Sequence, residues 1–128
     1  MIEGFEEQTH ELTEYELACV HSVISYLRLC VGVERAVKNY HIADNIGRGS
    51  LFDTKITPPR MRKIINYIRI NNLLPCLCSN SKGYYVARDK EELDSYIKSL
   101  YQRIKSISDV YEALRKQRER HFLQADEL

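Results

Sequence analysis

The stretch that decides the fold is residues 57–93, which read TPPRMRKIINYIRINNLLPCLCSNSKGYYVARDKEEL. Its first third predicts a helix, because Thr57 is a good N-cap residue and Pro58, at the first helical position, loses no hydrogen bond through its missing N–H. On a helical wheel Met61, Ile64, Ile65 and Ile68 fall within one narrow arc. That arc is expected to face the core, and the polar, basic arc opposite is expected to face outward.

The middle of the stretch predicts a β-hairpin and not a phosphate-binding loop, because a strand and no helix follows Gly83. We expect a short strand over residues 73–78, a turn over 79–83 and a returning strand over 84–87. Gly83 is expected to supply the positive φ that closes the turn. Tyr84 and Tyr85 would point to opposite faces of the hairpin, one into the core and the other to the surface or toward the preceding helix.

The end of the stretch begins a long helix. Asp89 and Glu92 form a predicted capping box, and no Gly or Pro interrupts the chain from there to about His121. Apolar residues recur along it at alternating spacings of four and three, which is a heptad pattern. The heptad seam consists of Leu93, Ile97, Leu100, Ile104, Ile107, Tyr111 and Leu114.

Two interpretations of the heptad seam are open. It can pack against the N-terminal helix of its own chain, or it can pair with a second chain. A helix of about 30 residues is roughly 45 Å long, which exceeds what a domain this small can cover. We therefore expect the distal half, from Ile104 to Leu114, to form a homodimer interface.

The residues before the stretch predict two further helices. Thr13 and Glu16 form a capping box for a helix that runs to about Leu29, with Leu17, Val20, Ile24 and Leu27 facing inward. After Gly32, a shorter helix is expected over residues 34–46, with Ala36, Val37, Tyr40 and either Ile42 or Ala43 facing inward. The loop that follows contains Arg48-Gly49-Ser50, which lacks the Lys-Ser/Thr of a phosphate-binding loop and is expected to be a linker.

The expected fold is mostly α with a small β-hairpin (α+β). Three helices, a hairpin and a long helix follow the order of a winged helix-turn-helix domain with a long C-terminal helix. We expect an acidic N-terminal tail over residues 1–12, a winged-helix domain over 13–88, a dimerisation helix over 89–122 and a tail over 123–128.

A resemblance to a known family points the same way. Residues 56–93 contain the pattern R-x-x-I-x-x-I-R, a short hairpin, and a GYY-A strand that runs into an acidic helix start. In these features the chain resembles the small winged helix-turn-helix DNA-binding proteins of phages and prophages, over about residues 13–92. The resemblance implies that the third helix reads DNA and that the hairpin contacts the DNA backbone. It also implies a regulator of transcription or replication of phage or mobile-element type.

The distribution of charge supports an anion-binding middle region. The net charge is +1, but residues 1–20 carry six glutamates and no Lys or Arg. Residues 21–88 carry eleven Lys or Arg against three acids, and residues 89–128 carry eight against nine. A basic region flanked by acidic and near-neutral ends concentrates an anion-binding surface between them.

Residues suited to sequence-specific binding of double-stranded DNA lie in this basic region. Arg62 and Lys63 are suited to guanine and Asn66 to adenine, because these side chains match the base edges in the major groove. Phosphate contacts are expected from the hairpin and from the loop before the third helix, and the remaining residues on that helix either read bases or flank the reading side chains. The additional candidates are Arg60, Tyr67, Ser81, Lys82, Arg48 and Lys55. The alternatives are an ordinary solvated face, or an adaptor or assembly protein that binds other proteins through the winged domain and a coiled coil.

Other functional classes find little support in the sequence. We expect no enzyme, because the chain has no nucleophile motif, no paired carboxylates, no Gly-rich nucleotide fingerprint and only scattered histidines. The four cysteines do not have zinc-ligand spacing, so reduced, packed thiols are expected and no metal or other cofactor. Cys76 and Cys78 are expected on one face of a strand.

The same sequence argues against a membrane protein. It has no run of eighteen apolar residues. Its acidic N-terminus differs from the basic start of a signal peptide. A cytoplasmic location and no membrane partner are therefore expected.

Overall fold

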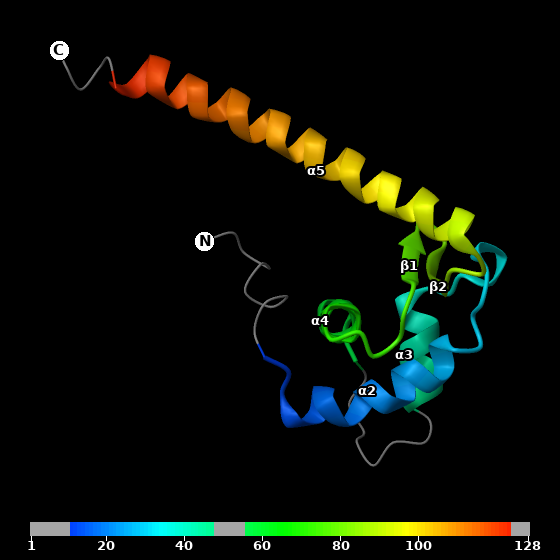
Figure 1. Ribbon diagram of the computed structural model, residues 1–128. Helices are drawn as coiled ribbons and strands as arrows, with labels where there is room; N and C mark the ends of the chain where they lie inside the picture. The colour runs from blue at the N-terminus through cyan, green and yellow to red at the C-terminus, as the bar shows by residue number, and fades with distance from the viewer. Residues whose placement is uncertain (1–10, 48–55, 124–128) are drawn as a thin grey trace. The chain divides into compact units, whose positions relative to one another are not determined.

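The structure is a computed structural model that describes residues 11–47 and 56–123 (Figure 1). The chain divides into two compact units, Met1–Leu93 and Asp94–Leu128. Its described helices are α2 (Glu14–Leu27), α3 (Asn39–Gly47), α4 (Pro58–Ile70) and α5 (Lys90–Arg118), with short turns of other helix types at Val33–Arg35 and Glu119–Leu123. The strands β1 (Leu77–Asn80) and β2 (Gly83–Val86) form one antiparallel hairpin. The expected mostly helical fold with a small hairpin is thereby confirmed.

The core of the first unit lies where α2, α3 and α4 meet. The predicted inward arc of α4 is confirmed, because Met61, Ile64, Ile65 and Ile68 are at most 1% exposed. From α2 and α3 the core receives Val23, Leu27 and Ile42, all fully buried. The start of α4 is also as predicted, since the Thr57 hydroxyl accepts a hydrogen bond from the Arg60 N–H and Pro58 is the first helical residue.

The predicted capping box of α2 is present. The Thr13 hydroxyl accepts from the Glu16 N–H at 3.2 Å, and Glu16 Oε1 accepts from the Thr13 N–H at 2.8 Å. The helix ends at Leu27, two residues earlier than expected. Leu17, expected to face inward, is exposed, because the buried arc of α2 runs through Glu16 instead.

The segment between α2 and α3 differs most from expectation. The expected helix over residues 34–46 begins only at Asn39, and Tyr40 is exposed. Ahead of it, the chain pairs with the outer edge of β2. Val37 and Tyr84 exchange both backbone hydrogen bonds at 2.9 and 2.7 Å, and Val86 bonds to Cys30 and Gly32 at 2.8 Å. The backbone N–H and C=O groups on the second edge of β2 find their hydrogen-bond partners in this way. The need for these partners overrides the local helical pattern of residues 34–38.

The hairpin is shifted along the sequence relative to expectation. β1 begins at Leu77 and not at Leu73, because Asn72 and Cys76 adopt positive φ angles of 55° and 64° that break an extended strand. The turn consists of Ser81 and Lys82 alone, between the paired residues Asn80 and Gly83.

Gly83 has the positive φ that was predicted for it, at 131°. A Cβ on this residue would also overlap the backbone carbonyl of Val37. Glycine is therefore required here both by the backbone conformation and by the close approach of residues 30–37.

Helix α5 begins at the predicted place, and Asp89 caps it, because Asp89 Oδ1 accepts from the Glu92 N–H at 2.9 Å. The predicted capping box is incomplete, since Glu92 Oε1 accepts from the Arg88 N–H at 3.0 Å and not from the N–H of Asp89. The helix contains 29 residues and is followed by the π-helical turn Glu119–Leu123, close to the expected end. In the part of the chain that the structure describes, no helix is both long and apolar enough to cross a membrane.

Candidate nucleic-acid interface

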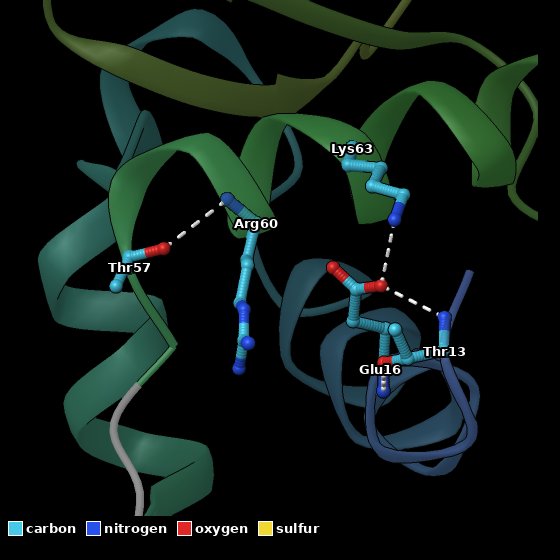
Figure 2. Close-up of polar contacts among 5 residues, drawn as sticks. All are labelled: Thr13, Glu16, Thr57, Arg60 and Lys63. Carbon is cyan, nitrogen blue, oxygen red and sulfur yellow. Dashed lines mark hydrogen bonds and ion pairs between the residues drawn. The ribbon is translucent and has the colours of Figure 1, made fainter. Parts of the chain in front are cut away.

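One flank of α4 is attached to α2 by a buried ion pair. Lys63 Nζ lies 2.9 Å from Glu16 Oε1, and the side chains of Lys63 and Glu16 are 11% and 1% exposed (Figure 2). Lys63 was expected to read base edges. Its ammonium instead neutralises a buried carboxylate, so the candidate DNA surface does not include it.

Glu16 is held in its charged form by its neighbours. Burial raises the pKa of this carboxyl, but hydrogen bonds from the Thr13 backbone and the Lys63 ammonium outweigh it, and the pKa is lowered overall. Protonation of a carboxylate that closes a capping box and also accepts from a lysine removes its charge and weakens both contacts, and an apolar replacement removes them. The same side chain therefore supports the start of α2 and the position of α4.

The other flank of α4 is attached to the hairpin by Arg69. Its Nε donates to the Leu77 carbonyl at 3.0 Å and its Nη2 donates to the Ser79 hydroxyl at 3.3 Å. The guanidinium carbon also lies 5.9 Å from the centre of the Tyr84 ring. Arg69 had no predicted role, although its position one residue after the buried Ile68 was a signal that its side chain could reach a neighbouring element. Of the two hairpin tyrosines, Tyr85 is buried and Tyr84 is half-buried.

The surface of α4 between these flanks carries the other side chains that were predicted to contact base edges. Arg62 is exposed and Asn66 is half-buried, on the side of the helix opposite the core arc. Arg60 is exposed as well, and its guanidinium carbon lies 5.8 Å from the centre of the Tyr15 ring. Figure 2 shows Arg60 extending from α4 separately from the Lys63–Glu16 pair. Tyr67, expected to flank the readers, is half-buried and packs against the core.

Two cationic side chains lie at the hairpin turn, Lys82 from the turn itself and Lys38 from the segment before α3. Lys82 is exposed, and its backbone N–H donates to Asn80 Oδ1 at 2.7 Å, which fixes the turn. Lys38 Nζ donates to the Ser81 carbonyl at 2.5 Å. Lys38 was not among the predicted residues, because the sequence placed it inside a helix. Arg48 and Lys55 lie outside the described residues.

The heptad seam is exposed along most of its length. Ile97, Ile104, Ile107, Tyr111 and Leu114 are between 52% and 69% exposed, while Leu93 and Leu100 are half-buried. Tyr101 and Val110, which were not predicted, widen the apolar stripe and are exposed to a similar degree. Their positions, three or four residues from seam members, are the signal that could have found them.

The cysteines are free thiols. Cys19, Cys30 and Cys78 are buried, and burial raises the pKa of each. Cys76 precedes β1 and is exposed, so the expectation that it shares a strand face with Cys78 is wrong. Among the residues that the structure describes, no three His, Cys, Asp or Glu side chains gather as metal ligands would.

No family model, curated protein or solved structure matches this chain.

Proposed function

We propose that this protein is a winged helix-turn-helix protein that binds double-stranded DNA sequence-specifically through α4 and the hairpin. In this proposal it acts in the cytoplasm as a regulator of transcription or replication of phage or mobile-element type, and it pairs two copies through α5. The observation that carries the proposal is the surface of α4, where Arg62 is exposed and Asn66 half-buried between two flanks fixed by Lys63 and Arg69.

Fixed flanks favour readout by the residues between them. Side chains that read base edges must be held in register, which a helix attached on both sides provides. Arg62 can donate two hydrogen bonds to a guanine, and Asn66 can pair with an adenine. The order of three helices followed by a hairpin is typical of domains that insert the third helix into the major groove.

Phosphate contacts in this proposal come from the hairpin turn. Lys82 is exposed there, and Lys38 reaches the same turn through the Ser81 carbonyl. Two ammonium groups beside one turn suit the DNA backbone, which lysines and backbone N–H groups contact without regard to sequence. Arg60 supplies a further positive charge near the start of α4.

An adaptor function is favoured by one observation on the same helix. Ile70, at the end of α4, is 82% exposed. An apolar side chain in that position suits a protein partner better than a phosphate backbone. The dependence of affinity on salt concentration distinguishes the two functions, because DNA binding weakens steeply as salt rises and apolar docking does not.

Selection of bound sequences from random duplex DNA, followed by fluorescence anisotropy on the selected site, tests the DNA proposal. Arg62→Ala should weaken binding to the selected site by about 1–3 kcal/mol and relax the preference at one position. Lys105→Ala removes the same charge from an exposed position of α5 and serves as the matched control. Absence of binding at low salt, or an equal loss in both variants, would refute the proposal.

A further inference from the structure

Charge is segregated along α5. Residues 89–94 carry four acids, Asp89, Glu91, Glu92 and Asp94, against Lys90, and residues 115–120 carry four bases, Arg115, Lys116, Arg118 and Arg120, against Glu119. The exposed apolar stripe lies between these ends, from Ile97 to Leu114. A helix of this kind has an acidic end, an apolar middle and a basic end.

This segregation distinguishes the two ways in which two such helices can pair. In parallel pairing, acidic ends lie together and basic ends lie together, and Arg118, at the seam position after Leu114, faces its own counterpart. In antiparallel pairing, each acidic end lies beside the basic end of the partner, and the helix dipoles oppose one another favourably. We propose that two copies of this chain pair through α5 in antiparallel orientation, an inference that rests on the proposed pairing of α5.

One antiparallel register covers the whole stripe. It places Ile97 opposite Leu114 of the partner subunit, Leu100 opposite Tyr111 of the partner subunit, and Ile104 opposite Ile107 of the partner subunit. Twofold symmetry repeats each layer once. Beyond these layers, Glu91 lies level with Arg120 of the partner subunit, and the stem of Arg118 of the partner subunit covers Leu93.

The composition of the seam alone does not decide orientation. Counting Ile97 and Ile104 as heptad position a and Leu93, Leu100 and Leu114 as position d yields a pattern that is common in parallel dimers. Aliphatic layers pack in either direction, however, whereas flanking charges select orientation and like charges side by side oppose it. Arg115 already forms ion pairs with Glu112 and Glu119 of its own chain, at 3.0 and 3.2 Å. The orientation of the two helices therefore depends on the other charged residues near the two ends of α5.

Cysteine cross-linking tests the orientation. Cys76→Ser first removes the exposed thiol, and Ile97→Cys and Leu114→Cys are then made separately in that background. We expect the mixed proteins to form a disulfide-linked dimer on mild oxidation and each protein alone to stay largely unlinked. Lys105→Cys, exposed and outside the seam, is the control for random collision. Self-linking of each single variant, without preference in the mixture, would overturn antiparallel pairing and leave the dimer intact.

A distance measurement covers the case in which a cysteine in the seam weakens pairing. A spin label at Gln117→Cys in the Cys76→Ser background, at an exposed, uncharged position outside the seam, should report about 35 Å between subunits in the antiparallel dimer and less than about 25 Å in a parallel one. A short distance overturns the inference. If light scattering on the unlabelled Cys76→Ser protein returns the mass of a monomer, the pairing of α5 itself is overturned. The measurement of duplex binding tests the DNA proposal separately.

Discussion

Lys63 Nζ lies 2.9 Å from Oε1 of Glu16, and this pair joins α4 to α2 across 47 positions of sequence. A cation that the pattern of α4 assigns to the outer, ligand-facing arc is therefore a structural residue. Its removal leaves a buried carboxylate without a counter-charge, which is more costly than the loss of an exposed pair.

Lys63→Ala should lower the free energy of unfolding by about 3 kcal/mol, because Glu16 remains buried and charged. Urea unfolding of the full chain measures this. Arg62→Ala, one residue away and exposed, should change stability by less than about 0.5 kcal/mol and is the matched control. A second comparison is Glu16→Gln with Lys63→Met, which should recover most of the loss, because the glutamine keeps the hydrogen bond from the Thr13 N–H and no charge is left unpaired. Equal stability losses for Lys63→Ala and Arg62→Ala would contradict this role.

Stability should fall in acid through Glu16. Its pKa is lowered in the folded state, so the unfolded chain binds the proton more readily. The contribution of this carboxylate is therefore fully present above the ordinary glutamate pKa of about 4.3 and is lost as pH falls through the lower folded pKa. Between about pH 3 and 7, the urea midpoint of Glu16→Gln should depend less on pH than that of Glu11→Gln, which changes an exposed residue and serves as the control. An unchanged pH dependence in Glu16→Gln would refute the assignment.

Gly83→Ala should destabilise the protein by more than about 1 kcal/mol, because the added Cβ requires both a positive φ and space that the Val37 carbonyl occupies. Thermal unfolding measures the loss. Ser81→Ala, exposed in the adjacent turn, should have little effect. A Gly83→Ala protein as stable as Ser81→Ala would show that residues 30–37 do not pair closely with β2.

Arg69→Ala should loosen the hairpin while leaving α4 helical. It removes hydrogen bonds to Leu77 and Ser79, and bonds from a charged donor contribute about 1.5–3 kcal/mol each at most. Hydrogen exchange at the backbone N–H groups of the hairpin should accelerate more than exchange within α4. Arg69→Lys should not restore protection, since one ammonium cannot reproduce the two-pronged guanidinium contact. Full protection in Arg69→Lys would contradict that geometry.

Ile104→Asp should convert a dimer to a monomer, because it places a charge in the centre of the apolar stripe of α5. Light scattering at micromolar concentration measures the mass. Lys105→Asp changes an exposed neighbour outside the heptad seam and should leave the dimer intact. A wild-type monomer, or a dimer that survives Ile104→Asp, would exclude the heptad seam as the interface.

Features that depend on neighbours along the chain were predictable. The capping box at Thr13, the N-caps at Thr57 and Asp89 and the inward arc of α4 all arise from residues within a turn or two of one another. The heptad seam is likewise a local repeat. The repeat alone does not determine which helix packs against the seam or in which direction that helix runs.

The misplaced features depend on contacts between distant segments. Residues 34–38 have a helical pattern, yet the unpaired edge of β2 takes Val37 as its backbone partner. Residues 73–76 look like a strand, yet positive φ angles at Asn72 and Cys76 redirect the chain before β1.

By itself, the sequence determined the starts of α2, α4 and α5, the apolar face of α4 and the glycine at position 83, because each follows from the spacing of residues in one segment. Only the tertiary structure decided that Lys63 neutralises Glu16, that Arg69 holds the hairpin and that Lys38 joins Lys82 at its turn. The physical reason is that a charged side chain on a helix flank takes the partner that packing brings within reach. For Lys63 that partner lies 47 residues away.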